Sequence, residues 1–342
     1  MVLQSRDINV LQYIVEDYIL NGLPVPSKKI AEFPEMQVSS ATIRNVVSEL
    51  EMNGYVTRPH SSAGSIPARK AYRLYVEALG SVNEMMLSSK LRRKVRHQLI
   101  QSVSNDINTW GSTAVNLLSN LVGSLAIVTA PQSFQLYVNQ IHVIKIQNNT
   151  LLLIVVFPGA VIKQKILSFP NHIDQSLIDE SITYLNHIFV NKSYHQIKDV
   201  DLPLGTVKKK LFKSVLFVLE EQQQKIQFDY RLDGLRNLLI QPEFVNRNGL
   251  LHSLVHDIEQ GELLQLIMSL MPQVGTVRVV IGDEHSNNKM RPFSLIIGCY
   301  GISNNMIGSI AVVDSVRMQY LKGIASVKLM VNIMTDITRM VA

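Results

Sequence analysis

The sequence predicts a multidomain α+β protein whose N-terminal domain is a winged helix-turn-helix. Three features of the sequence support this prediction. Short amphipathic helical patterns fill the first 80 residues, a capped helix within them is followed by a basic hairpin, and long apolar alternations begin at about residue 120. The length of 342 residues allows about two or three domains and a substantial core.

The first two helices are indicated by their apolar spacing and by their ends. An amphipathic pattern starts at Ile8 and ends near Asn21 and Gly22, where glycine can adopt the left-handed conformation that closes a helix. A proline-rich turn then leads to Ser27, which we expect to cap a short helix over residues 28–33. With the next helix, this makes three helices in about fifty residues, which is typical of a helix-turn-helix.

The third helix, over residues 39–53, has clear signals at both ends. The hydroxyl of Ser39 can accept a hydrogen bond from a free amide of the first turn, and Gly54 favours a left-handed stop. One face is apolar, with Ile43, Val46, Val47 and Leu50 at helical spacing. The other face is small, polar and cationic, which suits a major groove because Arg and Asn can each pair with a base through two hydrogen bonds. The side chains predicted to contact DNA from this helix are Ser39, Ser40, Thr42, Arg44, Asn45 and Ser48. A face that meets only solvent is the alternative interpretation.

A basic hairpin is predicted after the third helix. Residues 55–58 form its first strand, residues 59–65 its turn, and Ile66 begins the return. No acidic residue occurs from residue 52 to residue 76, so positive charge dominates this segment and favours contact with DNA phosphates. The side chains predicted to make these contacts are Arg58, His60, Ser61, Ser62 and Arg69. Pro67 is expected to open the following helix.

A helical linker is predicted over residues 81–119. It carries a second basic run, with no acid from residue 85 to residue 105. The cations of this run are Lys90, Arg92, Arg93, Lys94 and Arg96. Two interpretations stay open: these charges touch phosphates that flank the binding site, or they solvate an exposed helix face.

The rest of the chain predicts strands, then helices, then strands again. Strands are expected at residues 125–129, 137–146, 151–157, 161–168, 277–281, 293–300 and 306–313, with hairpin turns at Asn148-Asn149 and Pro158-Gly159. Helices are expected at residues 173–189, 207–224, 250–270 and 317–340. This order suggests one α+β domain that is split by an insertion.

Composition excludes several classes of protein. Hydrophobic residues reach 46% and charged residues 18%, but no apolar run approaches the roughly 20 residues of a membrane span. The N-terminal pattern is not that of a secretory signal, so we expect a cytoplasmic protein without a membrane partner. Cys299 is the only cysteine, which excludes an internal disulfide and suggests a buried, inert thiol.

No complete catalytic or metal-binding motif is present. His252 and His256 are four residues apart on a predicted helix, with Glu259 and Glu262 nearby, but no third ligand is clearly placed. Neither a phosphate-binding nor a dinucleotide-binding glycine loop occurs, and there is no nucleophile elbow. We therefore expect no cofactor and no enzymatic activity.

Short motifs along the whole chain form an ordered series. In the N-terminal domain they are Gly22-Leu-Pro-Val-Pro-Ser-Lys, Val38-Ser-Ser-Ala-Thr-Ile-Arg-Asn, Leu50-Glu-Met-Asn-Gly-Tyr and Pro59-His-Ser-Ser-Ala-Gly-Ser-Ile-Pro. The later ones are Ala126-Ile-Val-Thr-Ala-Pro, Asn237-Leu-Leu-Ile-Gln-Pro-Glu-Phe and Arg317-Met-Gln-Tyr. In this combination the chain resembles the bacterial family of heat-inducible transcription repressors called HrcA.

The resemblance implies a domain plan and a function. The expected domains are a winged-helix DNA-binding domain at residues 1–80, the helical linker at 81–119, a GAF-like α+β domain formed by 120–189 and 273–342, and an inserted dimerisation domain at 190–272. The resemblance further implies a homodimer that binds double-stranded DNA at an inverted repeat and represses chaperone operons of the groE and dnaK type. A GroEL-type chaperonin is then expected to keep the repressor active until misfolded clients compete for it during heat stress.

Two positions depart from the family's usual pattern. Ser65 stands where the family usually has Arg after the Ala-Gly of the wing, so one expected phosphate contact is missing. Arg69 could partly replace it. Asp314-Ser-Val precedes Arg317 where the family usually has Gly-Pro-Thr, which concerns the C-terminal domain and not operator binding.

The main alternative is a winged-helix regulator whose GAF-like half senses a small molecule. Such a sensor needs a pocket with converging polar groups, whereas the predicted strands are overwhelmingly apolar. A winged-helix biotin protein ligase would need a glycine-arginine-rich loop, which is absent from the sequence. RNA binding would favour clustered aromatic residues, but these make up only 6% of the chain and do not cluster.

Overall fold

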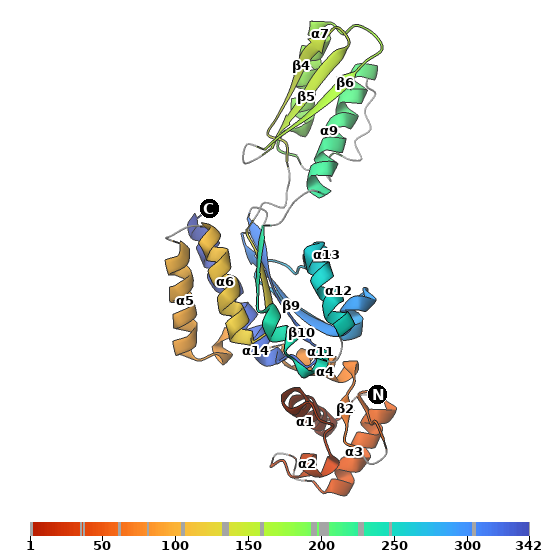
Figure 1. Ribbon diagram of the computed structural model, residues 1–342, viewed down its shortest axis with the longest axis vertical. Helices are drawn as coiled ribbons and strands as arrows, with labels where there is room; N and C mark the ends of the chain where they lie inside the picture. Colours follow the sequence, from red (N-terminus) through yellow and green to blue (C-terminus); the bar gives the residue numbers. More distant parts are fainter. Residues whose placement is uncertain are drawn as a thin grey trace. The chain divides into compact units, whose positions relative to one another are not determined.

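The computed structural model shows a mixed α+β, multidomain protein (Figure 1). It describes residues 3–34, 36, 38–60, 63–80, 82–103, 107–131, 137–157, 161–192, 197, 205–224, 229–245, 248–302 and 306–341. The chain divides into two compact units. The larger unit contains Met1–Pro131 and Asp229–Ala342, and the smaller contains Gln132–Phe228.

The N-terminal part of the larger unit holds three helices, a short hairpin and a fourth helix. These are α1 (Ser5–Asn21), α2 (Ser27–Ala31), α3 (Ser40–Met52), β1 (Val56–Thr57), β2 (Ile66–Pro67) and α4 (Arg69–Ala78). The predicted ends of α1 and α3 are confirmed, since Gly22 and Gly54 have φ values of 69° and 72°. The amide of Thr42 donates to the hydroxyl of Ser39, which caps α3.

Two local predictions in this part are wrong. Ser27 is the first residue of α2 and does not cap it, because Pro26 holds the cap position. The helix also ends at Ala31 and not at residue 33. Pro67 belongs to β2, where it pairs with Val56, and α4 starts two residues later at Arg69.

Helices α5 (Ser89–Val103) and α6 (Ile107–Val122) follow η1 (Glu84–Met86). The prediction of a linker over residues 81–119 is wrong, because α6 packs on a β-sheet through Trp110, Ala114 and Leu118. Helix α5 packs in turn on α6 and buries Val95 and Leu99. The sequence predicted helical structure in this segment but could not identify the surface on which it packs.

A five-stranded antiparallel sheet forms the centre of the larger unit. Its strands are β3 (Leu125–Thr129), β7 (Tyr230–Asp233), β8 (Val277–Ile281), β9 (Phe293–Gly301) and β10 (Ile307–Ser315), in the order β7-β3-β10-β9-β8. Every residue of β9 is buried, because helices cover both faces of the sheet. Alternate residues of β3 show the division, since Ala126 and Val128 belong to a different core cluster from Leu125 and Ile127.

One face of this sheet is covered by α6 and by the long C-terminal helix α14 (Tyr320–Val341). The other is covered by α10 (Leu235–Leu239), α11 (Pro242–Val245), α12 (Asn248–Glu259), α13 (Glu262–Ser269) and the one-turn segment η4 (Asn288–Met290). A second one-turn segment, η3 (Gly282–Glu284), directly follows β8. The helix predicted over residues 250–270 is two helices, since Gly261 has a φ of 74° and begins α13. Among the described residues, no helix combines the length and the apolar character that crossing a bilayer would require.

The smaller unit is a three-stranded antiparallel sheet with helices on one face. It contains β4 (Gln140–Gln147), β5 (Thr150–Val156), β6 (Ile162–Ser168), α7 (Gln175–Phe189) and α9 (Thr206–Gln224), and the strand order is β4-β5-β6. Leu151, Leu153 and Val155 of β5 are fully buried against the helices. The turn at Asn148-Asn149 joins β4 to β5 as predicted, whereas the predicted Pro158-Gly159 turn lies outside the described residues.

The inserted unit therefore occupies a different stretch from the predicted one. Strands over residues 140–168 pair only with each other, so they belong to the smaller unit and not to a split domain that includes 120–189. The helices from Leu235 to Ser269 pack on the five-stranded sheet, so the insertion is at 132–228 and not at 190–272. The sequence pattern shows which residues of a strand alternate between faces, but it does not show which strands pair with each other. The end of the insertion is therefore visible only in the structure, where β7 pairs with β3.

Candidate nucleic-acid interface

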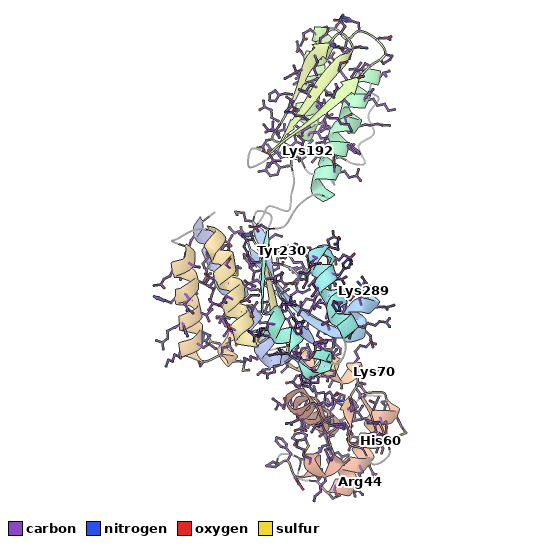
Figure 2. All side chains as sticks on the ribbon, viewed as in Figure 1. Arg44, His60, Lys70, Lys192, Tyr230 and Lys289 are labelled. Atoms are coloured by element: carbon purple, nitrogen blue, oxygen red, sulfur yellow. The ribbon has the colours of Figure 1, made fainter. Side chains whose placement is uncertain are left out.

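Helix α3 has a buried face and an exposed polar face. The side chains of Ile43, Val46, Val47 and Leu50 are at most 3% exposed and form part of the N-terminal core. The opposite face carries Ser39, Ser40, Ala41, Arg44 and Asn45, all exposed, with Thr42 and Ser48 half-buried at its edges. Figure 2 shows Arg44 at the surface of this N-terminal part.

Arg44 and Asn45 are available for a partner. Within the described part of the chain, no ion pair or hydrogen bond engages either side chain. Ser39 and Thr42 are occupied differently, because their hydroxyl oxygens lie 3.0 Å apart and Ser39 also accepts from the Thr42 amide at 3.2 Å. These two residues hold the start of α3, so they position its exposed polar face as well as border it.

Arg58 does not project freely from the hairpin. Its Nε donates to Oε2 of Glu51 at 2.8 Å, and the same guanidinium lies 3.5 Å from the hydroxyl of Ser48. The hydrogen bond from Arg58 lowers the pKa of Glu51, and the carboxylate raises the pKa of Arg58. The structure thus brings two predicted site residues, Arg58 and Ser48, together directly. It adds Glu51 as a partner of Arg58, which the sequence analysis missed although Glu51 immediately precedes the acid-free segment.

The remaining hairpin residues divide into three cases. His60 is exposed (Figure 2), and Ser61 and Ser62 lie outside the described residues. Ser65 is 1% exposed, and its backbone pairs with Val25 through hydrogen bonds of 2.9 and 2.8 Å. Position 65 of the hairpin is therefore buried against the turn that follows α1.

Arg69 lies on α4 and not on the exposed polar face of α3. It is the first residue of α4 and lines a cleft of about 350 Å³ together with Lys70, Arg73 and Glu284. Glu284 belongs to η3 beside the five-stranded sheet. Arg69 is therefore grouped with the residues that connect the N-terminal part to the sheet.

The first of these connections is an ion pair between Arg73 and Glu284. Arg73 Nε donates to Oε1 of Glu284 at 2.7 Å, and its Nη2 donates to the carbonyl oxygen of Val279 at 3.1 Å. Burial raises the pKa of Glu284, but hydrogen bonds from Arg73 and from the Ile281 amide outweigh it and leave the pKa below its ordinary value.

The second connection centres on Arg317, just before α14. Its Nε lies 2.7 Å from Oε1 of Glu243, and its guanidinium carbon lies 5.8 Å from the ring centroid of Tyr18. A Cβ built at Gly22 would lie 1.8 Å from Nη1 of Arg317, so the end of α1 touches this arginine. Arg317 therefore joins the N-terminal helix to α11 and to the start of α14.

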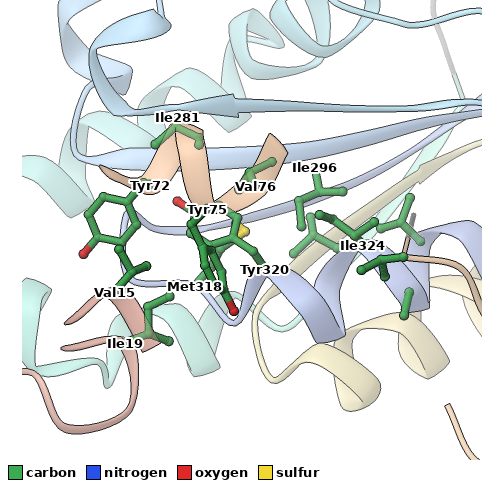
Figure 3. Packing of buried hydrophobic residues seen from close by; sticks show 14 of the residues in the cluster. Val15, Ile19, Tyr72, Tyr75, Val76, Ile281, Ile296, Met318, Tyr320 and Ile324 are labelled. Carbon is green, nitrogen blue, oxygen red and sulfur yellow. The ribbon is translucent and has the colours of Figure 1, made fainter. Parts of the chain in front are cut away.

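Apolar packing continues across the same boundary (Figure 3). Tyr72 of α4 lies with its ring centroid 6.1 Å from that of Tyr320 in α14. Val15, Ile281 and Met318 belong to the same buried cluster. The N-terminal part and the sheet consequently share one hydrophobic core.

The residues considered for metal or thiol chemistry give no site. His252 and His256 are both exposed on α12, and no group of three or more metal-ligating side chains occurs among the residues that the structure describes. Cys299 is buried in β9, as predicted, and burial raises the pKa of its thiol to about 11.

Comparison with known proteins places the chain in a family. A family model described as the HrcA protein C-terminal domain matches residues 110–324. A curated protein of Dehalococcoides mccartyi, named heat-inducible transcription repressor HrcA, is 34% identical over 98% of this chain and 96% of its own length. A protein of the same name from Chloroflexus aurantiacus is 27% identical over 98% and 94%.

A solved structure supports the fold over the full length. It is described as the crystal structure of a hypothetical protein, covers 100% of both chains, and has a TM-score of 0.61 at 22% identity. With a family model matched over more than half of its residues and a relative of 34% identity along nearly its whole length, this chain belongs to the HrcA family.

Proposed function

We propose that this protein is a transcription repressor of heat-shock operons that reads an inverted-repeat operator as a homodimer. One observation carries the DNA-reading part of the proposal. Arg44 and Asn45 are both exposed on a helix whose other face is buried, and within the described residues neither side chain has a hydrogen bond or an ion pair. Membership of the HrcA family supports the choice of heat-shock operons.

The N-terminal part is proposed to work as a winged helix-turn-helix. Helices α2 and α3 form the helix-turn-helix, α3 enters the major groove, and the β1–β2 hairpin is the wing. Arg44 suits two acceptors on guanine and Asn45 suits adenine, while Ser40 at the start of α3 suits a phosphate. Arg58, His60, Ser61 and Ser62 supply backbone contacts from the wing, with Arg69 as a more distant contributor.

A homodimer is proposed to form through the open sheet face of the smaller unit. Opposite its helices, β4 and β6 expose Ile144, Ile146, Ile162 and Ile166, each at least half exposed. Ile144 and Ile166 lie on either side of Leu152 in one row across the three strands. This face is mostly apolar, although His142 and Gln164 also lie on it, and it favours burial against an identical face. A two-fold dimer presents two reading helices to half-sites about 34 Å apart or a multiple of it.

The five-stranded sheet with its helices is proposed to be GAF-like and to act as a scaffold. The cavity that Trp110, Tyr300 and Arg231 line has a volume of about 20 Å³, room for about one water molecule, so it gives no support to a small-molecule sensor there. Release on heating is proposed to follow loss of a GroEL-type chaperonin to misfolded clients. The low charged fraction of 18% and the large apolar content support a chain that benefits from assisted folding.

The decisive experiment is a titration of the purified protein with DNA duplexes from chaperone promoters. We expect an inverted-repeat duplex to bind at least about a thousandfold more tightly than a scrambled duplex of the same composition at physiological salt. Equal affinity for the two duplexes contradicts the proposal. Refolding in the presence and absence of chaperonin, followed by the same titration, tests the release mechanism separately.

A further inference from the structure

The smaller unit contains a basic cleft that DNA reading by α3 does not use. It lies between α9 and β6 and has a volume of about 590 Å³. Four lysines line it, namely Lys165, Lys209, Lys210 and Lys213, together with Thr206 and the ring of Phe217. No carboxylate is among the lining residues.

The charge in this cleft is largely uncompensated. Within the described ranges, Lys165, Lys209 and Lys213 have no ion pair. The neighbouring Lys208 differs, because its Nζ lies 2.6 Å from Glu180 outside the cleft. Lys210 is oriented by a hydrogen bond to the carbonyl oxygen of Ser168. The arrangement is thus a cluster of mostly exposed ammonium groups without counter-charges, which attracts anions.

Helical spacing sets these groups in a line. Thr206, Lys210, Lys213 and Phe217 follow at intervals of three or four residues, so they form one stripe along α9, and they line the cleft together with Lys165 of β6. The stripe begins at the positive end of the helix dipole. From Lys210 to Phe217 the helix rises by roughly 10 Å, which suits an extended anion and not a single phosphate.

Phe217 ends this stripe with an exposed ring. The side chain is 51% exposed, whereas Phe212 on the same helix is 7% exposed. The Nζ of Lys165 lies 3.8 Å from the ring centroid of Phe217, so the aromatic face is joined to the cationic groups. Exposed aromatic rings beside cations are a common platform for nucleobases, because every base can stack on them.

We propose that this cleft binds a nucleoside polyphosphate. The lysines at the start of α9 hold the phosphates, and the base stacks on Phe217. Lysine suits this task, because its ammonium is a mobile point charge that binds phosphate without the planar geometry of arginine. The site is independent of the operator-reading face, so it stands or falls separately from the proposed repressor function.

Calorimetric titration of the full-length protein tests this assignment. ATP is expected to bind more tightly than inorganic tripolyphosphate, which lacks a base, and than adenosine, which lacks phosphates. The double variant Lys209→Ala, Lys213→Ala is expected to weaken ATP binding about tenfold or more, and Phe217→Ala to reduce it to the level of tripolyphosphate. Lys192→Ala is the matched control, an exposed lysine of the same unit outside the cleft (Figure 2), and should leave the affinity unchanged.

Three results would overturn the proposal. They are failure of ATP to bind the wild-type protein, equal affinity for ATP and tripolyphosphate, or the same affinity in the double variant and the wild type. A change in the salt dependence of operator binding in the double variant, without ATP binding to the wild type, would assign the lysines to DNA instead. The comparison of three ligands on the wild-type protein needs no variant, so a folding defect cannot obscure the outcome.

Discussion

The guanidinium of Arg58 is paired with the carboxylate of Glu51, and this pair links the residue after β1 to the last turn of α3. The cation that the sequence assigns to phosphate contact is therefore partly neutralised before DNA arrives. The same guanidinium reaches Ser48. The segment after β1 and helix α3 are consequently held together by one small polar cluster.

Replacing Glu51 with Gln should release Arg58 for phosphates. We expect tighter binding to every DNA sequence and a salt dependence steeper by about one counterion, because one anion near the DNA is removed and one cation is freed. Arg58→Ala should have the opposite effect on both quantities. DNA affinity measured at several salt concentrations tests this prediction. If neither variant alters the slope of log affinity against log salt concentration, Arg58 does not contact phosphate and only fixes the hairpin.

Arg44→Ala and Asn45→Ala should each weaken operator binding by about 1–3 kcal/mol and relax the preference at one position of each half-site. Neither change should affect folding, because both side chains are exposed. Met52→Ala is the control, since Met52 is 79% exposed on the same helix and is not assigned to a base. Competition with single-base operator variants measures the effect. An unaltered base preference would show that the substituted residue does not contact a base.

Gly22→Ala should lower the free energy of unfolding by more than backbone strain alone. Its φ of 69° disfavours a side chain, and the new methyl group would displace Arg317 from Tyr18 and Glu243. Gly261→Ala is a matched control, because Gly261 has a φ of 74° but no atom within 4 Å of the added Cβ. We expect a cost of about 1–2 kcal/mol for the control and a larger one for Gly22 in urea denaturation. Equal losses of unfolding free energy in the two variants would show that Arg317 can move away from the new methyl group without a cost in stability.

Asp314→Asn should change how stability depends on pH. Burial raises the pKa of Asp314 above its ordinary value of 3.8, although Ser124, Gln241 and the Ser315 amide all donate to it. A folded state with a raised pKa holds the proton more tightly, so this stabilising contribution is complete below about pH 3.8 and is lost as pH rises through the folded pKa.

Asparagine keeps the oxygen that accepts from Gln241 and Ser315 but cannot ionise. The difference in unfolding free energy between Asp314→Asn and the wild type should therefore grow in favour of the variant from pH 4 to pH 8. Asp314→Ala, which loses all three hydrogen bonds, should be less stable than Asp314→Asn at each pH. A difference that stays constant across this range would mean that Asp314 titrates normally.

The double variant Ile144→Glu, Ile166→Glu should convert the dimer to a monomer. Glutamates on two strands of the open sheet face would have to be buried without partners, while the isolated unit tolerates them because both positions are at least half exposed. Light scattering measures the molar mass, and circular dichroism checks the fold. Ile100→Glu, at a position 41% exposed on α5, should leave the mass unchanged. A dimer that survives the double substitution places the interface elsewhere.

Local sequence signals predicted much of the N-terminal part, because caps and glycine stops act within a few residues. Ser39 and Gly54 mark the two ends of α3 as expected, and the four positions of its predicted apolar face are buried. The errors at Ser27 and Pro67 are also local. Pro26 takes the cap position of α2, whereas Pro67 is held in the hairpin and Ala68 takes the cap position of α4.

Long-range partners were beyond prediction from sequence. Strand alternation over residues 140–168 was correct, but the assignment of these strands to the same domain as β3 was wrong. For the candidate site, the exposure of Arg44 and Asn45 followed from helical periodicity, whereas the pairing of Arg73 with Glu284, 211 residues later, depends on tertiary packing. Arg317 stood out as part of a motif, but its contact with Gly22 could be seen only in three dimensions.

The inserted unit begins and ends at two strands that are hydrogen-bonded neighbours. Thr129 of β3 lies opposite Tyr230 of β7, and the amide of Ala130 donates to the carbonyl oxygen of Asp229 at 2.7 Å. Antiparallel neighbours need only a turn of a few residues between them. The whole segment 132–228 thus stands in the place of a hairpin loop, so evolution or a protein engineer can shorten, exchange or delete it without breaking any strand pairing of the large sheet.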